Sequence, residues 1–284
     1  MAEPEIRAGQ SIELLKALHI LTRDGKMNQD SRRKLKQVYH LFQFIEPLLR
    51  QLDEDGKPFT LVDHGAGKSY LGFILYDLFF KDHANGAAIH CIETRAELVE
   101  RTSALARQLG FARMHFHHLS VADSITSEKL PPVVDIVTAL HACDTATDDA
   151  ISFALKKQAR FIVLVPCCQA EVAATLRRFK GQSLARDVIT EVWRHPIHTR
   201  EFGSHLTNVL RCLQLEAHGY QVNVTELVGW EHSMKNELII ATRKDLPRQK
   251  AADRLREVLA TMGLQAMEER FWLPEPRDAA MPAA

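Results

Sequence analysis

One stretch decides the fold: Phe59-Thr60-Leu61-Val62-Asp63-His64-Gly65-Ala66-Gly67-Lys68-Ser69-Tyr70. A short apolar strand runs directly into a turn with two glycines, and an apolar helix is predicted to begin at the end of that turn. In an open α/β sheet, ligands bind at the carboxyl ends of the strands, and the loop after the first strand is the usual cofactor contact. The stretch therefore predicts a cofactor loop at residues 63–69.

Strands and helices alternate on both sides of this loop, which is typical of a parallel sheet with helices on its two faces. The predicted strands are 59–63, 88–92, 114–117, 134–139, 161–165, 221–228 and 237–242. The predicted helices between them are 70–80, 96–109, 147–157, 169–180 and 204–218. The last two strands are too close for a helical crossover, so they predict an antiparallel hairpin. We expect a doubly wound α/β fold with a seven-stranded, mostly parallel sheet and an antiparallel last strand.

Amphipathic helices are also predicted outside the alternating region. They cover residues 11–22, 31–52 and 251–262. Asp30-Ser31 is a candidate N-cap for the second of them. We expect three parts in the chain: an N-terminal helical extension over 1–55, the main domain over 56–245, and a C-terminal helix and tail over 246–284.

Composition narrows the classes of partner and compartment. The 36 basic residues balance the 36 acidic ones, so no overall field gathers nucleic acid or a membrane surface. The five cysteines lack disulfide-like spacing and the first residues are too polar for a secretory signal, which predicts a cytoplasmic protein. The longest apolar run is too short for a bilayer span. The oligomeric state is not indicated.

A glycine-rich loop can bind several classes of ligand, and individual residues in and around it distinguish between these classes. Val62 stands where a triphosphate-binding loop needs glycine, and Tyr70 stands where a dinucleotide fingerprint needs glycine or alanine. Asp63 suits the amino group of a methionine moiety, and Glu93 ends the next strand, where a carboxylate accepts ribose hydroxyls. Asp123 follows strand three, where an adenine edge would lie. The pattern favours S-adenosyl-L-methionine, and the predicted cofactor site comprises Asp63, Gly65, Ala66, Gly67, Lys68, Tyr70, Glu93, Asp123 and His141.

Four segments resemble motifs of one family. Residues 63–71 resemble D-x-G-x-G-K-[GS]-[YHF]-L, residues 140–148 resemble L-H-x-C-G-x-A-T-D, residues 166–169 resemble P-C-C-[HQ], and residues 231–236 resemble E-H-T-x-K-N. They are similar to a methyltransferase-domain family that includes the methyltransferase-like part of the glutathione S-transferase C-terminal domain-containing protein. The resemblance covers residues 30–243 and implies a class I S-adenosylmethionine-dependent methyltransferase.

The same resemblance implies an acceptor. Similar histidine- and cysteine-containing segments occur in a eukaryotic transfer-RNA ribose methyltransferase, so the expected acceptor is RNA, either tRNA or rRNA. Asp144 stands where the family has glycine, which is a departure on the substrate side.

The ends of strands four and five are expected to face each other across the methyl donor. His141 is the candidate that orients or deprotonates a nucleophile, with Asp148 beside it, although His141 can equally cap the following loop. The predicted substrate-binding residues are Pro166, Cys167, Cys168, Arg194, Arg200 and Asn236. Cys143, Cys167, Cys168 and His141 are three thiols and an imidazole, but adjacent cysteines are unlike a structural zinc site, so no metal is expected.

Two basic segments remain open to two interpretations. The first is Arg32, Arg33, Lys34 and Lys36, which are either a solvated helix face or a phosphate contact. The second is an insertion before residue 204 that interleaves arginines with Phe179 and Trp193, either for RNA or as a helix pair with its aromatics packed inward. The alternatives to an RNA methyltransferase are a catalytically silent cofactor- or RNA-binding module, a protein or small-molecule methyltransferase and, more distantly, a nucleotide-dependent oxidoreductase.

Overall fold

The computed structural model describes residues 6–83, 86–140, 145–166, 170–179, 188–227, 237–244, 249–271 and 273. Within these residues, seven strands form one sheet in the order β3-β2-β1-β4-β5-β7-β6. The strands are β1 (Thr60–His64), β2 (Ala88–Glu93), β3 (Met114–His118), β4 (Ile136–Leu140), β5 (Phe161–Val165), β6 (Tyr220–Glu226) and β7 (Glu237–Arg243). All neighbours are parallel except β7, which runs antiparallel to both β5 and β6. The predicted sheet and its terminal hairpin are confirmed.

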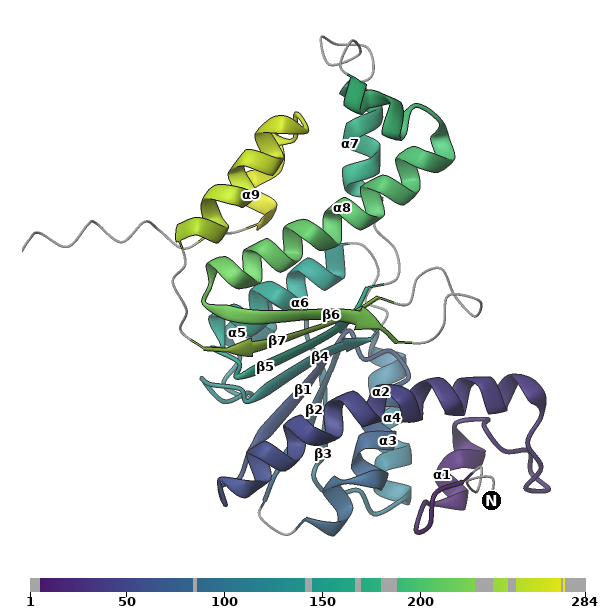
Figure 1. Ribbon diagram of the computed structural model, residues 1–284. Coiled ribbons are helices and arrows are strands. Elements are labelled where there is room, and N and C mark those ends of the chain that lie inside the picture. Colours follow the sequence, from purple (N-terminus) through teal and green to yellow (C-terminus); the bar gives the residue numbers. More distant parts are fainter. Residues whose placement is uncertain are drawn as a thin grey trace, which may run out of the picture.

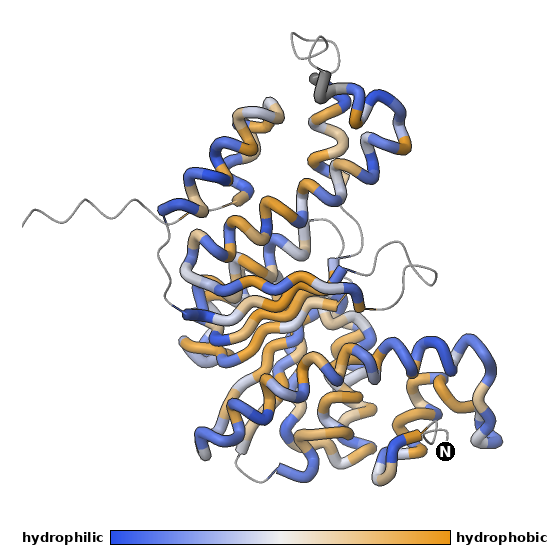
Figure 2. The backbone as a smooth tube through the Cα atoms, viewed as in Figure 1, coloured by the Kyte–Doolittle hydropathy of each residue, from blue (hydrophilic) through white to orange (hydrophobic). Residues whose placement is uncertain are grey.

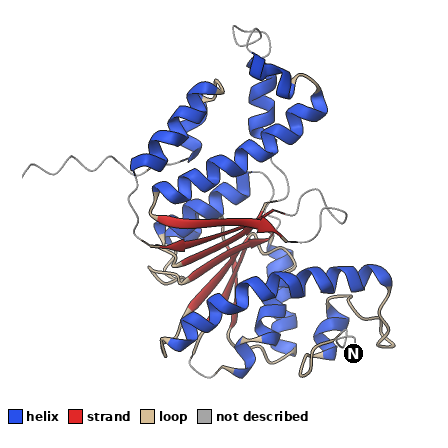
Figure 3. Ribbon diagram, viewed as in Figure 1, coloured by secondary structure: helices blue, strands red, loops and turns tan. Residues whose placement is uncertain are grey.

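Helices cover both faces of the sheet, as Figures 1 and 3 show. One face carries α2 (Gln29–Glu54), α3 (Tyr70–Leu78) with the 3-10 turn η1 (Phe80–Asp82), and α4 (Ala96–Gln108). The other carries α5 (Val121–Thr126), α6 (Thr145–Lys156) and α8 (Pro196–Ala217). Side chains alternate along each strand, so Leu61 and Val62 are both fully buried but belong to different hydrophobic clusters on opposite faces. Figure 2 shows the central strands as the most hydrophobic part of the chain.

The N-terminal helices pack against the first of these faces. Leu14 and Ile45 share a buried cluster with strand residues, so the predicted boundary near residue 55 separates elements with a common core. Helix α1 (Ile12–Ala17) is shorter than the predicted helix over 11–22, because the backbone turns left-handed at His19, with φ at 55°. The predicted N-cap at Asp30-Ser31 is wrong: Asn28 caps α2, and its side-chain oxygen accepts a hydrogen bond from the Ser31 amide at 2.8 Å.

A small helical unit stands on α8, away from the sheet (Figure 1). It consists of α7 (Glu171–Phe179), η3 (Val188–Trp193), α9 (Gln249–Thr261) and η4 (Gln265–Phe271), which pack with α8. Helix α8 begins at Pro196 rather than at the predicted Ser204, since proline suits the first helical position, where its missing N–H costs nothing. The unit has its own apolar cluster, which includes Leu210 and Leu255. None of the helices in the described ranges is long and apolar enough to cross a membrane.

Candidate cofactor and acceptor site

The loop after β1 turns through left-handed conformations at every second residue. Gly65, Gly67 and Ser69 have φ angles of 66°, 58° and 53°. Glycine adopts this region at no steric cost, whereas Ser69 does so at some expense. Two hydrogen bonds hold the turn: the Ala66 amide donates to the Ile92 carbonyl at 3.0 Å, and the Ser69 amide donates to the Ala66 carbonyl at 2.7 Å. The turn therefore brings its backbone close to the end of β2, where the predicted cofactor site lies.

Asp63 is a buried carboxyl at the end of β1. Only 2% of the residue is exposed, and its Oδ1 accepts a hydrogen bond from the Thr138 hydroxyl at 2.8 Å. Burial raises the pKa of Asp63 to about 7, and the bond from Thr138 offsets only part of this effect. Among the described residues, no cationic side chain forms an ion pair with it. A buried carboxylate without a counterion is costly, so this position suits a cationic ligand group.

Glu93 lies at the end of β2 and ties the loop to that strand. Its Oε2 accepts a hydrogen bond from the Gly67 amide at 2.8 Å, and its Oε1 accepts one from the Arg95 Nε at 2.9 Å. Burial of the carboxyl alone would raise its pKa, but the bonds from Arg95 and Gly67 outweigh burial and hold the pKa below its ordinary value. Glu93 is therefore an ionised acceptor beside the loop. The Arg95 side chain is 60% exposed, so it is free to swing aside for a ligand hydroxyl.

Two partners at these acids were not identified from the sequence. Thr138 pairs in register with Asp63 across β1 and β4, and it is the polar residue within an apolar strand. That interruption of the apolar run is the signal that sequence reasoning passed over. Arg95 lies two residues after Glu93, and nothing in the spacing showed that it would fold back onto the carboxylate.

Asp123 lies in the first turn of α5. Its carboxylate accepts a hydrogen bond from the Ser120 hydroxyl at 2.6 Å, while the Ser120 oxygen accepts from the Asp123 amide at 3.2 Å. This is a local helix cap, and the Leu119 amide donates to the Glu93 carbonyl at 3.3 Å, which joins the cap to the end of β2. The predicted adenine contact of Asp123 stays a prediction.

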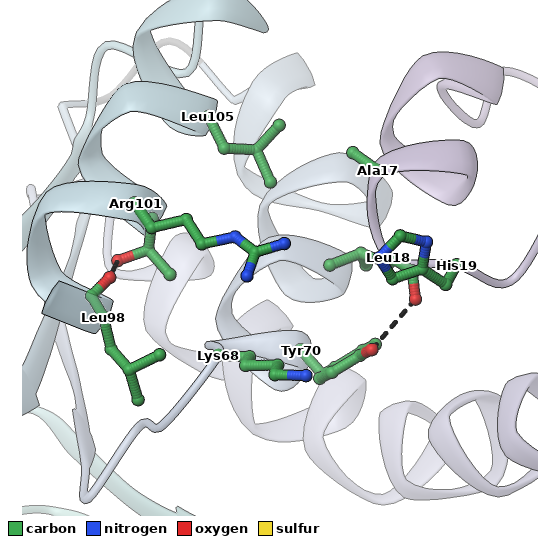
Figure 4. A pocket seen from close by; sticks show the side chains of 9 residues that line it. Ala17, Leu18, His19, Lys68, Tyr70, Leu98, Arg101 and Leu105 are labelled. Atoms are coloured by element: carbon green, nitrogen blue, oxygen red, sulfur yellow. Dashed lines mark hydrogen bonds between the residues drawn. The ribbon is translucent and has the colours of Figure 1, made fainter.

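Lys68 and Tyr70 lie at the end of the loop, on the side that faces α1 and α4. The Tyr70 hydroxyl donates to the Leu18 carbonyl at 2.9 Å and so fixes the end of α1 against the start of α3. Lys68 is exposed and lines a pocket with Tyr70 and with residues of α1 and α4 (Figure 4). The structure thus joins Gly67 to Glu93, places Asp63 near the end of the adjacent strand β1, and directs Lys68 to a neighbouring pocket.

Asp148 occupies a buried ion pair in the first turns of α6. Arg211 of α8 has no exposed surface and donates from Nε to Asp148 Oδ1 at 2.6 Å and from Nη2 to Oδ2 at 3.1 Å. The Arg211 Nη1 also donates to Asn208 Oδ1 at 3.1 Å, and the Asn208 amide donates to Glu237 at 2.8 Å. This network joins α6, α8 and the start of β7. The predicted catalytic role of Asp148 stays a prediction beside this observed structural one.

The remaining predicted acceptor residues are only partly described. His141, Cys143, Asp144, Cys167, Cys168 and Asn236 lie outside the described residues. Pro166 is buried directly after β5. The described part of the chain contains no group of three or more His, Cys, Asp or Glu side chains arranged to hold a metal ion, and Cys91 is a buried free thiol whose pKa burial raises.

The described part of the basic insertion, residues 171–179 and 188–203, is mainly helical. Trp193 is 3% exposed and stacks on Phe202, with ring centroids 5.0 Å apart, so its side chain packs inward rather than toward a nucleic-acid base. Arg194 is exposed and pairs with Glu191 at 3.0 Å, and Arg200 pairs with Glu201 at 2.9 Å. The substrate roles predicted for these two arginines stay predictions.

The sheet order, the antiparallel β7 and the acidic residues beside the glycine turn define the class I methyltransferase fold. A model of the family described as "Methyltransferase domain" matches residues 33–175. The chain belongs to this family. Membership confirms the predicted enzyme class, methyltransferase, and the predicted methyl donor, S-adenosylmethionine.

Curated relatives share the protein name that the sequence motifs indicated. The chain is 23% identical over 236 residues to the glutathione S-transferase C-terminal domain-containing protein of Bos taurus, and 24% identical over 235 residues to that of Mus musculus. Each alignment covers 77% of this chain but 34% of the relative. The chain therefore spans about a third of the length of these relatives.

Solved methyltransferases share the general fold at low similarity. A putative caffeoyl-CoA O-methyltransferase from Staphylococcus aureus is 10% identical, with a TM-score of 0.46 over 82% of this chain and 92% of its own. Magnesium protoporphyrin IX methyltransferase from Synechocystis with bound SAM is 12% identical, with a TM-score of 0.45 over 84% and 100%. Both scores lie below 0.5, and the substrates of these enzymes say nothing about the acceptor of this chain.

Proposed function

We propose that this chain transfers the methyl group of S-adenosylmethionine to an RNA, with Asp63, Glu93 and the turn at Gly65 and Gly67 holding the donor. The observation that carries the proposal is the Asp63 carboxyl, which is buried beside the cofactor turn and has no cationic partner among the described residues. When bound, S-adenosylmethionine supplies a cationic amino group and an electrophilic methyl group.

Each side chain has a distinct task in this arrangement. Asp63 would pair with the amino group and regain the stabilisation that it lacks when buried alone. Glu93 would accept ribose hydroxyls once the exposed Arg95 side chain swings away, while its bond from the Gly67 amide keeps the turn in place. The left-handed Gly67 allows close approach of a ligand, since a Cβ there would meet nothing nearer than the Arg95 Nη2 at 3.8 Å. His141 remains the proposed group beside the acceptor atom.

Calorimetric titration with S-adenosylhomocysteine tests the donor site. Asp63→Ala should lower affinity at least about tenfold, because a charge-assisted contact in a buried site is lost. Asp82→Asn, which changes an exposed acid at the end of the same βα unit, is the matched control and should bind as wild type does. Equal affinity for the two variants contradicts the proposed role of Asp63.

The class of acceptor is tested by finding which molecules receive a labelled methyl group from the donor. Arg177 and Arg178 are adjacent, exposed arginines in the last turn of α7, and such a pair of cations favours RNA, a polyanion, over a small molecule. Purified protein should be incubated with methyl-labelled donor and separate fractions of total RNA, total protein and small metabolites. Label in the RNA fraction supports the proposal, whereas label only in another fraction assigns a different acceptor. Label in none, with intact donor binding, indicates a catalytically silent module.

A further inference from the structure

A small basic pocket adjoins the cofactor turn on the side of the N-terminal helices (Figure 4). It lies between the end of α1, the turn residue Lys68 and the middle of α4, with Leu98 and Leu105 as apolar walls. Its volume is about 40 Å³, which at 10–15 Å³ for each water-sized group is room for roughly three such groups. The pocket can therefore hold about two or three oxygen atoms of a phosphate group whose remainder lies outside it.

The charged groups in this pocket are all potential cations. Lys68, Arg101 and His19 line it, and no carboxylate does. Figure 4 shows the Arg101 guanidinium directed into the space and the Lys68 side chain running along the Tyr70 ring. Glu97 lies one helical turn before Arg101, but its electrostatic interaction is with Arg95.

Neither Lys68 nor Arg101 forms an ion pair with a carboxylate among the described residues. Arg50 and Arg194, for comparison, each pair with a carboxylate on the same or the adjacent turn. Two uncompensated cations that converge on one pocket repel each other, and a bound anion removes this repulsion. The Tyr70 bond to Leu18 holds the two walls of the pocket together, so the site is assembled before any ligand arrives.

The basic first turns of α2 extend this charge beyond the pocket. The Ser31 hydroxyl donates to the His19 carbonyl at 3.4 Å, and Tyr70 acts electrostatically on Lys34, so the start of α2 adjoins the pocket. Its basic residues Arg32, Arg33, Lys34 and Lys36 are all exposed, and Lys34 pairs with Asp30 at 3.0 Å. Positive charges at a helix N-terminus oppose the helix dipole, so this placement does not serve helix stability. The chain is neutral overall, which makes this a local concentration of charge.

We propose that the pocket of Lys68, Arg101 and His19 binds a backbone phosphate of the acceptor RNA, and that the first turns of α2 contact the flanking phosphates. The inference rests on the proposed function, because it takes the acceptor to be RNA. Phosphate contacts fix the register of a nucleic acid without reading its sequence. Lys68 directly follows Gly67 of the cofactor turn, so a phosphate held here places the RNA beside the methyl donor.

Arg101→Gln tests the pocket, with Arg107→Gln as its matched control. Both arginines are exposed on α4, but Arg107 lies in the last turn and does not line the pocket. The probe is a fluorescein-labelled RNA hairpin, and anisotropy is measured at several salt concentrations. Arg101→Gln should weaken binding about five- to tenfold and reduce the salt slope of binding by about one, whereas Arg107→Gln should change neither.

The outcomes separate this inference from the proposed function. Both variants should bind S-adenosylhomocysteine as wild type does, because neither arginine belongs to the donor site. If the methyl label enters RNA but Arg101→Gln and Arg107→Gln bind the hairpin with the same affinity and salt slope, the proposed phosphate pocket is wrong. The proposed RNA methyltransferase function then still stands. If the label enters only protein or small molecules, the RNA acceptor fails and the pocket inference fails with it.

Discussion

Replacing Arg211 by methionine should destabilise the fold strongly, because it leaves the Asp148 carboxylate buried without its partner. Arg211 is fully buried and donates two hydrogen bonds to Asp148 and one to Asn208. Removal of one partner from a buried ion pair costs about 3–5 kcal/mol. Arg270 lies 3.9 Å from Asp148 and is 27% exposed, so it can compensate in part. We therefore expect the unfolding free energy to fall by an amount near the lower end of this range, about 3 kcal/mol.

The assay is urea unfolding followed by tryptophan fluorescence, which reports on the buried Trp193. Arg254→Met is the control, since Arg254 is 57% exposed and pairs with Glu216 on the surface; it should change the unfolding free energy by less than about 1 kcal/mol. The double variant Arg211→Met/Asp148→Leu should recover most of the loss, because an apolar pair needs no compensating charge. A loss below about 1 kcal/mol for Arg211→Met would refute the reasoning.

Four further predictions concern Asp148, Asp63 and Gly203. Asp148→Asn should lower methyl transfer at temperatures where the fold is intact if the side chain acts in catalysis, and should lower only stability if its role is the ion pair. The pKa of Asp63 is about 7 when folded and about 4 when unfolded, so the folded state binds more protons in between. Its contribution to the unfolding free energy should therefore fall as pH rises through this window, and Asp63→Asn should remove that slope. Affinity for S-adenosylmethionine should rise from pH 6 to pH 7.5 in calorimetry as the carboxylate forms, and a flat profile contradicts the assignment. Gly203→Ala should cost about 1–3 kcal/mol in urea unfolding, because its Cβ would lie 2.7 Å from the Ala173 backbone and push α7 from α8; the exposed Val209→Ala on α8 should be nearly neutral.

Much of the fold was predictable because its determinants are local. Apolar strands and amphipathic helices show in the sequence as apolar residues at a spacing of two to four, and the glycine turn is a single short motif. All seven strands begin and end within two residues of their predicted limits. The errors occur where local signals compete. At the start of α2, Asn28 and Ser31 are both acceptable caps, and only the backbone path decided for Asn28.

Some residues of the candidate site could be predicted from local sequence, whereas their partners could not. Asp63 and the glycine turn were found because a strand followed by such a turn places its last residue at the cofactor edge, and Glu93 was found because it ends the next strand. The partners that set the chemistry come from distant parts of the chain: Thr138 lies 75 residues from Asp63, and Arg211 lies 63 residues from Asp148. Such pairs depend on strand register and helix packing, and neither has a local sequence signal.

The sequence by itself determined the class of the protein, the methyl donor and the edge of the sheet where that donor is proposed to bind, since each depends on short motifs and on their order along the chain. Only the tertiary structure decided that Trp193 packs inward, that Arg211 holds Asp148, and that Lys68 and Arg101 converge on one pocket. The physical reason is that burial and unbalanced charge belong to the arrangement of side chains in space, which many separate elements create together.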